Sequence, residues 1–249
     1  MAINLQKGQK IDLRKSTGEA LTNFCVGVNW GAIETIKPGL FGIGSKKVIE
    51  DVDLDLSCIM LDQNGELVDW IYSPEYNAWL SQNKFPLGKL TSNDGGLRHS
   101  GDDRQGDVGG DDGLDNEIIT VDLNRVSNNV DRIFFFLNIY LNQGQNFDFS
   151  QIPFAKIRMY EGTPTRVNSV FSNYDIVTDS SYRGKGALIL GKLYRRNGEW
   201  KFDAIGDPTD DKLFIQTIQK IDDIFIINSQ SNIYKSKNNA GLSDFKIGA

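Results

Sequence analysis

Short runs in which apolar and polar residues alternate make up most of the chain, with Gly, Asn and Asp between the runs. Period two is the repeat of a β-strand, because successive side chains of a strand point to opposite faces of the sheet. Residues 24–30 alternate in this way and predict a half-buried strand, and residues 52–60 alternate similarly before both faces become apolar. Residues 132–141 are apolar almost throughout, which indicates a central strand.

Turn signals divide these runs at the spacing expected of a sandwich or barrel. Asn64-Gly65 and Asn197-Gly198 are each typical of a two-residue hairpin turn. Residues 37–47 are Gly-rich and basic and predict an exposed hairpin. Residues 74–116 form a long irregular stretch. Because a structureless connection rarely exceeds about 15 residues, we expect this stretch to be functional.

Helical periodicity is convincing in one segment, which follows Asp207-Pro208. Acidic residues occupy its predicted first turn, and apolar residues then recur at helical spacing as far as Ile221. Residues 223–249 are rich in Ser, Asn and Lys and predict a loose tail. The pattern therefore predicts an all-β fold: a β-sandwich of two mainly antiparallel sheets over residues 1–222, with a C-terminal helix and a tail over residues 223–249.

Composition agrees with a soluble globular protein. The chain has 249 residues, of which 39% are hydrophobic, so it can bury a sizeable core and is not expected to be disordered. Neither a signal-peptide core at the start nor a run of about 18 apolar residues is present, so we expect a cytoplasmic protein with reduced thiols. Cys25 and Cys58 lie inside apolar runs and are predicted to be small buried hydrophobes.

The net charge of −6 is concentrated in residues 94–117, which hold eight acidic and two basic side chains. Like charges at this density repel one another unless a cation or a basic partner compensates them. Nucleic acid is not expected as a partner, because no stripe of Lys and Arg is present to replace phosphate counterions.

The acidic window has the composition of a calcium loop. Seven glycines, which permit positive φ angles, alternate with short carboxylates that supply hard oxygen ligands. Calcium takes about six to eight oxygen ligands in a flexible shell, whereas zinc is excluded in practice by a single histidine and two distant cysteines. The EF-hand spacing fails at every starting position. A solvated acidic loop without a metal is the alternative.

Asp53 and Asp55 add a second source of carboxylates. In a strand they project from one face with Cα atoms roughly 7 Å apart. They could share one ion, or supply two adjacent ions at the rim of the sandwich, and the acidic loop would complete the coordination.

Several segments in order resemble the TerD family, the tellurite-resistance and chemical-stress proteins of bacteria. The resemblance covers residues 1 to about 220 and rests on these segments: LQKGQKIDL near the start, VGVNWG at 26–31, DVDLDLS at 51–57, HSGDDRQGD at 99–107, DNEIITVDL at 115–123, GQNF at 144–147 and LYRRNGEWKFDAIGD at 193–207. Three departures from the family pattern are an apparent insertion, VGGDDGL, Asp103 in place of the commoner Asn, and Asn116 in place of the middle Asp of a closing Asp-Asp-Glu triplet.

The resemblance implies a calcium-binding β-sandwich, with the ions between the Asp-rich strand and the acidic loop. The charge of −6 in that loop predicts two calcium ions, which would offset most of it. The family's ligand positions correspond to Asp53, Asp55, Asp102, Asp103, Asp115 and Glu117. The insertion leaves three interpretations open for Asp107, Asp111 and Asp112: ligands, an outer shell, or a solvated loop. The resemblance also implies a role in the bacterial stress response. We expect a binding or scaffold module that is not an enzyme, with other stress-resistance proteins or the inner membrane surface as candidate partners.

Two other functions remain as alternatives. A metal-dependent enzyme would need a base beside the ion, for which His99 is the candidate. A calcium-dependent membrane-docking module would use the tip of the predicted hairpin, where apolar residues lie among lysines. The residues of that contact are Leu40, Phe41 and Ile43 with Lys37, Lys46 and Lys47.

Overall fold

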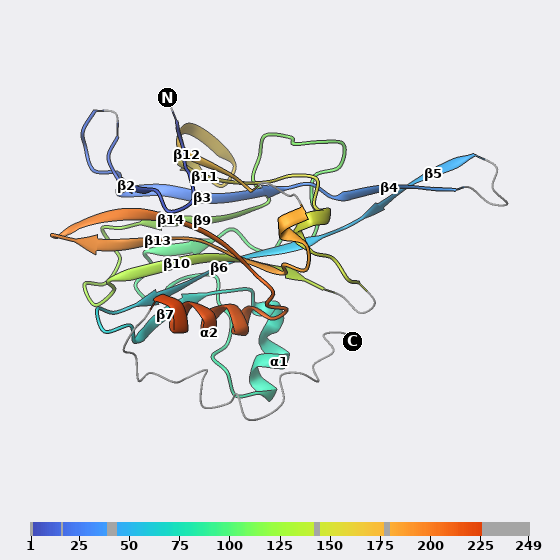
Figure 1. Cartoon of the computed structure of the whole chain (residues 1–249). Helices are drawn as coiled ribbons and strands as arrows, with labels where there is room; N and C mark the ends of the chain where they lie inside the picture. The colour runs from blue at the N-terminus through green and yellow to red at the C-terminus, as the bar shows by residue number, and fades with distance from the viewer. Residues whose placement is uncertain (1, 16, 39–43, 142–144, 177–179, 226–249) are drawn as a thin grey trace.

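Two six-stranded sheets pack face to face in the computed structural model, which describes residues 2–15, 17–38, 44–141, 145–176 and 180–225 (Figure 1). The first sheet has the order β1-β12-β11-β3-β9-β8. Its strands, in that order, are Ile3–Asn4, Arg166–Ile176, Ala155–Thr163, Asn23–Trp30, Glu117–Asp122 and Leu97–His99.

The second sheet has the order β2-β14-β13-β10-β6-β7. Its strands, in that order, are Lys10–Asp12, Glu199–Thr209, Ala187–Arg196, Arg132–Tyr140, Asp53–Leu61 and Leu67–Ile71. Neighbouring strands in both sheets are antiparallel, apart from β1 and β12, which are parallel. The predicted sandwich of two mainly antiparallel sheets is confirmed.

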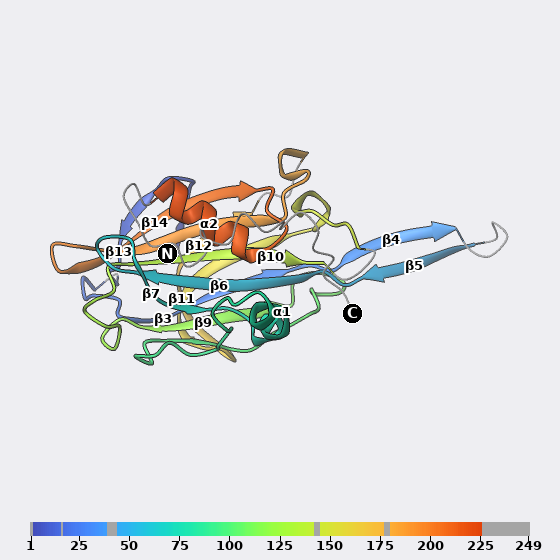
Figure 2. The same cartoon turned by 90° about the horizontal axis from the view of Figure 1, so that it is seen from below.

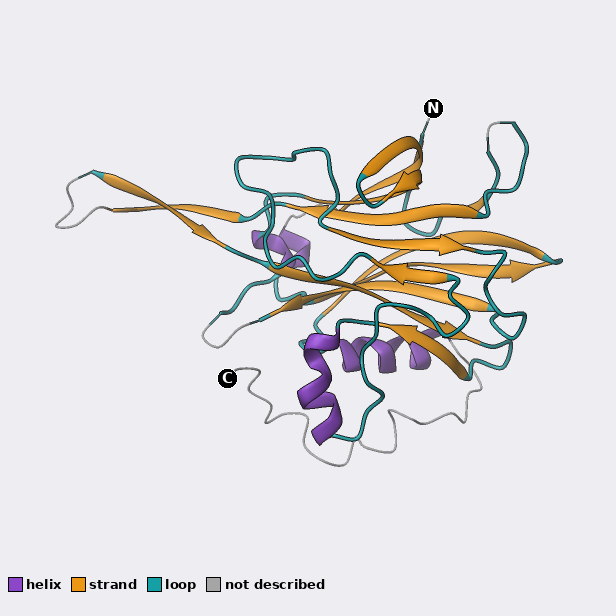
Figure 3. Cartoon of the chain, turned by 180° about the vertical axis from the view of Figure 1, so that it is seen from behind, coloured by secondary structure: helices purple, strands orange, loops and turns teal. Residues whose placement is uncertain are grey.

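The remaining elements are a two-stranded ribbon and short helices. The ribbon pairs β4 (Ile33–Pro38) with β5 (Ser45–Glu50) and projects from one end of the sandwich (Figure 2). The helices are η2 (Pro74–Tyr76), α1 (Asn77–Gln82), η3 (Phe149–Gln151), η4 (Ser180–Tyr182) and α2 (Phe214–Phe225). Figure 3 shows α1 and α2 together beside the second sheet.

The main core lies between the sheets, and a second apolar layer lies between the second sheet and α2. Phe135 and Leu137 of β10 point into the main core, whereas Phe134 and Phe136 pack under the helix. All four side chains are fully buried, because both faces of β10 are covered. The prediction of a central strand over residues 132–141 is therefore confirmed.

Two sequence-based predictions about residues 74–116 and 208–221 are wrong in detail. The helix begins at Phe214. β14 continues to Thr209, which pairs with Ala187, so the start of the expected first helical turn belongs to the sheet. Residues 74–116 are not structureless, since they contain η2, α1 and β8. Ser73 begins this part by accepting a hydrogen bond from the Glu75 N–H, which caps η2.

Turn and burial predictions also differ in places. Asn197-Gly198 joins β13 to β14 with both residues at positive φ, which confirms the hairpin. Asn64-Gly65 instead lies in a longer connection, in which Asp62 accepts from the Asn64 N–H. The predicted half-buried strand, β3, is buried on both faces after its first residue.

Two of the predicted features lie wholly or partly outside the residues that the structure describes. The hairpin tip with Leu40, Phe41 and Ile43 lies outside the described residues, as do residues 226–249 of the tail predicted over 223–249. The start of that prediction is wrong, because α2 continues to Phe225. Cys25 and Cys58 are buried free thiols on β3 and β6, which belong to different sheets.

Among the described residues, no helix is both long enough and apolar enough to cross a bilayer.

Replacing Phe135 with Ala should lower the free energy of unfolding by about 3–5 kcal/mol, because the side chain is 1% exposed between the sheets and its loss leaves a cavity. Urea denaturation followed by circular dichroism measures the change. Leu87→Ala is the matched control: its side chain is 51% exposed, so we expect a change within about 0.5 kcal/mol. Equal effects of the two substitutions would contradict the assigned core.

Candidate metal centre

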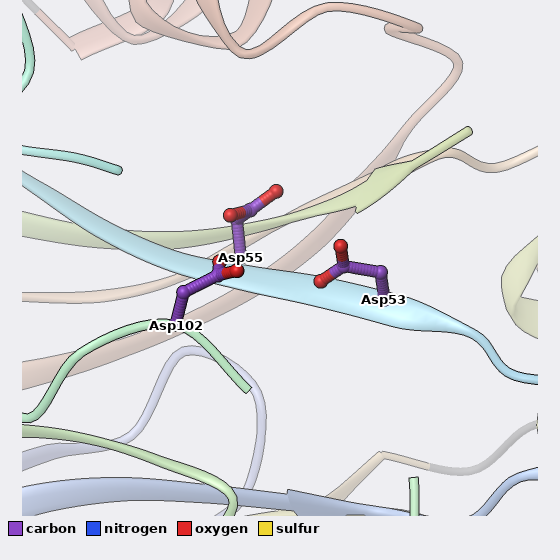
Figure 4. Close-up of side chains that lie close together, drawn as sticks. All are labelled: Asp53, Asp55 and Asp102. Atoms are coloured by element: carbon purple, nitrogen blue, oxygen red, sulfur yellow. The ribbon is translucent and has the colours of Figure 1, made fainter. Parts of the chain in front are cut away.

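Three carboxylates converge where β6 begins. Asp53 and Asp55 come from alternate positions of β6, and Asp102 comes from the loop between β8 and β9 (Figure 4). One carboxylate oxygen from each residue lies within 4.8 Å of the other two. The predicted shared face of Asp53 and Asp55 is thus present, and the loop brings a third acidic side chain to it. We call this group the strand cluster.

The loop reaches β6 because the first half of that strand has an unpaired edge. β7 pairs with β6 only from Cys58 to Leu61, which leaves the backbone before Cys58 free on that side. Glu117, 1% exposed at the start of β9, fills the gap: its Oε2 accepts from the Leu56 N–H at 2.6 Å. Its Oε1 accepts from the Asp103 N–H at 3.3 Å. One buried carboxylate therefore joins the two sheets and positions the acidic loop.

His99 supports the same corner and is held neutral. Burial is the main reason that its pKa falls to about 4. Its Nδ1 accepts from the Gly101 N–H at 3.0 Å, and its Nε2 lies 3.4 Å from Glu117 Oε2. Both ring nitrogens are engaged in holding the loop.

The strand cluster is electrostatically unfavourable without a cation. Burial, followed by the nearby charges of Asp55, Asp102 and Glu117, raises the pKa of Asp53 to about 9. Burial and the charge of Glu117 likewise raise the pKa of Asp55 well above its usual range. Asp55 accepts a hydrogen bond from the Tyr76 hydroxyl, whereas the buried Oδ1 of Asp53 has no partner among the described residues. An unpartnered buried carboxylate oxygen costs free energy that a bound cation would offset.

Arg104 only partly neutralises the cluster. Its Nε lies 3.0 Å from Asp102 Oδ2, and its terminal nitrogen contacts Glu75, so the guanidinium is shared between two carboxylates. The side chain is also 61% exposed, which weakens its effect on the buried oxygens. The donor set as a whole consists of carboxylate oxygens, which suits a hard divalent cation such as calcium.

A second group of acidic residues lies in the apparent insertion. Carboxylate oxygens of Asp107, Asp111 and Asp112 fall within 4.8 Å of one another, and we call them the loop cluster. Asp107 Oδ2 accepts from the Asp112 N–H at 2.9 Å. Asp111 already has strong partners, since its Oδ2 pairs with Lys156 at 2.5 Å and its Oδ1 accepts from the Asn29 side chain at 2.9 Å. The loop cluster is therefore more exposed than the strand cluster and better compensated.

Asp115 and Asp103 lie in neither cluster. Asp115 is 1% exposed in its side chain and forms an ion pair with Arg158, whose Nε is 2.8 Å from its Oδ1. It packs on Gly27, where a Cβ atom would lie 2.0 Å from Asp115 Oδ2. Asp103 Oδ1 accepts from the Gln105 N–H, and the Asn116 side-chain amide approaches its Oδ2. The side chains of Asp103 and Asp115 therefore hold the loop in place and do not join the strand cluster.

The basic partners of the loop are the main feature that sequence reasoning missed. Lys156 and Arg158 alternate on the outer face of β11 and pair with Asp111 and Asp115, so two acidic residues of the loop have basic partners outside it. The alternation of Lys and Arg in the segment FAKIRMYEG was the available signal. The same contacts place the loop over β3, which explains why Asn29 is buried. No signal in the sequence pointed to Tyr76.

Comparison with known proteins agrees with this architecture. The chain is 34% identical over 214 residues to stress response protein SCP2 of Bacillus subtilis (strain 168), which covers 85% of this chain and 94% of the relative. It is 33% identical over 210 residues to tellurium resistance protein TerD of Serratia marcescens, which covers 83% of this chain and 90% of the relative.

A solved structure, described as the unknown function protein SAV2460, superposes with a TM-score of 0.52 at 19% sequence identity. The superposition covers 78% of this chain and 92% of the chain in that structure, which shows that the two proteins share a fold. The family model described as TerD domain matches residues 1–218. The chain therefore belongs to the TerD family.

Proposed function

We propose that this protein is a calcium-binding module of the bacterial response to tellurite and chemical stress, which acts in the cytoplasm by binding other components. The observation that carries the calcium proposal is the strand cluster. It holds three converging carboxylates, and the buried Oδ1 of Asp53 has no partner in the part of the chain that the structure describes. The stress-response role follows from family membership and from the names of the relatives.

Calcium suits the site better than magnesium does. Two ligands come from a strand and one from a loop with several glycines at positive φ, so the shell can adjust to a large ion. Glu117 would support the site from beneath, since both of its oxygens already accept backbone N–H groups. Asp53, Asp55 and Asp102 would be the direct protein ligands.

The loop cluster is our candidate for a second ion. Asp107 and Asp112 are available there, but binding would have to compete with Lys156 for Asp111. We therefore expect the second ion to bind more weakly than the first.

A binding role is favoured over catalysis by the state of His99. The chain has one histidine, and it could act as a general base only with a free ring nitrogen near the ion. Its Nδ1 accepts from Gly101 and its Nε2 faces Glu117, so the imidazole is engaged in holding the loop.

Calcium should stabilise the folded protein. At about 100 times the dissociation constant, a ligand of the native state adds about 2.7 kcal/mol to the free energy of unfolding. Asp53→Asn should abolish most of this gain, because it removes a charged ligand from the strand cluster. Melting temperature in chelator and in millimolar calcium measures the effect, with Asp51→Asn as the control on an exposed neighbour. An unchanged melting temperature in the parent protein would contradict the proposal.

Calorimetric titration should separate the two clusters. We expect the parent protein to bind a tight ion and a weaker one, and Asp111→Asn to remove only the weaker event. Asp55→Asn should remove the tight event, because Asp55 is 4% exposed at the centre of the strand cluster. Loss of the tight event in Asp111→Asn would assign the principal site to the loop cluster and refute our assignment.

A further inference from the structure

The strand cluster lies on the face of the second sheet that α2 covers. Side chains of a strand alternate between its two faces, and Phe136 of β10 and Ile59 of β6 both belong to the apolar layer under the helix. Residues an even number of positions from these two point the same way, which applies to Asp53, Asp55 and Asn138. Asn138 is therefore a polar residue on the same face as the two aspartates.

The pairing register brings Asn138 close to both aspartates. Asn138 pairs directly with Asp55, and Tyr140 pairs with Asp53. Directly paired side chains of two antiparallel strands have Cβ atoms about 4.5–5.5 Å apart, and diagonal ones at most about 7–8 Å. Asn138 is thus the direct neighbour of Asp55 and the diagonal neighbour of Asp53. The three side chains form a triangle across two adjacent strands.

The side-chain oxygen of Asn138 has no partner in the parts of the chain that the structure describes. The residue is 2% exposed, so bulk water does not satisfy this oxygen. Its Nδ2 donates to Thr217 Oγ1 of α2 at 2.9 Å, which fixes the plane of the amide. Ionised carboxylates only accept hydrogen bonds, so the two neighbouring aspartates cannot supply the missing donor. A cation is a partner that amide and carboxylate oxygens can share.

We propose that Asn138 is a fourth protein ligand of the cation in the strand cluster and binds it through Oδ1. This inference rests on the calcium proposal above, and it extends the site from the rim of the sandwich to the face beneath α2. Calcium takes about six to eight oxygen ligands, among which amide carbonyls are common. Thr217 would be a positioning residue, because its Oγ1 holds the amide nitrogen away from the aspartates.

Ser57 provides a matched control on the same face. Its hydroxyl oxygen is also buried and without a partner within the described ranges, and the residue is 1% exposed. It pairs with Phe136, so it lies beyond Asp55 on the side away from Asp53. A hydroxyl can also rotate and donate, whereas an amide oxygen can only accept. Ser57 therefore lies outside the triangle, and we do not expect it to bind the cation.

Calorimetric calcium titration of the full-length protein tests the role of Asn138. Asn138→Leu keeps the side-chain volume and removes the oxygen, so it should weaken binding of the tight ion at least about tenfold. Ser57→Ala should bind calcium as tightly as the parent protein does. Thr217→Val should weaken binding several-fold, and Thr217→Ser should restore it, because serine keeps the hydroxyl oxygen that holds the amide.

Asn138→Asp separates a cation ligand from a hydrogen-bond donor. A carboxylate can bind the cation but cannot donate when ionised, so this variant should keep tight calcium binding. In chelator it should melt at a lower temperature than the parent protein, because it adds another acidic group beside Asp53 and Asp55. The rise in melting temperature on adding calcium should therefore be larger than in the parent. Weak binding by both Asn138→Leu and Asn138→Asp would show that the amide acts as a donor, and would overturn the proposal.

Terbium luminescence gives a readout that a purely structural role of Asn138 would not change. Terbium replaces calcium at oxygen sites, and Tyr76, whose hydroxyl donates to Asp55, is placed to sensitise its emission. Emission lifetimes in H2O and D2O count the water molecules on the ion. Asn138→Leu should increase that number by about one, because water takes the position of the lost ligand.

The two proposals fail in different ways. A parent protein that binds no calcium would contradict the calcium proposal and the role of Asn138 with it. If the parent binds calcium and Asn138→Leu binds it equally well, with an unchanged number of waters on terbium, only the role of Asn138 is overturned. A buried water would then be the partner of its oxygen.

Discussion

The buried carboxylate of Glu117 is the interaction on which this end of the sandwich depends. It accepts the backbone N–H of Leu56, on the unpaired edge of β6, and the N–H of Asp103 in the acidic loop. Backbone groups at a buried edge need partners, and here a side chain from the other sheet supplies one. As a consequence, a buried acidic group lies beside Asp53 and Asp55 and adds to the negative charge where the strand cluster forms.

The acidic side chains of the loop have two different roles. Asp102 turns inward to the strand cluster, whereas Asp111 and Asp115 pair with Lys156 and Arg158 on the outer face of β11. The ion pairs hold the inserted part of the loop against the first sheet, where Gly27 leaves room for Asp115. Anchoring by these pairs keeps the loop close to β6 without using the inward-facing carboxylate. The excess negative charge is therefore partly structural, and the uncompensated part lies at the proposed calcium site.

Family membership and local chemistry support different parts of the functional proposal. The match to the TerD domain over residues 1–218 places the chain among proteins that include tellurium-resistance and stress-response proteins. The argument for calcium rests on this chain's own geometry, above all on the unpartnered oxygen of Asp53.

Local pattern in the sequence was sufficient for the sandwich, the central strand over residues 132–141, the hairpin at Asn197-Gly198 and the shared face of Asp53 and Asp55. These features depend on the alternation of neighbouring residues, which a strand converts directly into faces. Tertiary structure decided which acidic residues meet. Asp102 joins Asp53 because Glu117 bridges the sheets, and Asp115 is withdrawn to Arg158, which lies 43 residues later in the chain. It also moved the start of the predicted helix to Phe214, because pairing with Ala187 kept Thr209 in a strand. Contacts between distant segments follow from strand order and packing, and no local repeat in the sequence encodes them.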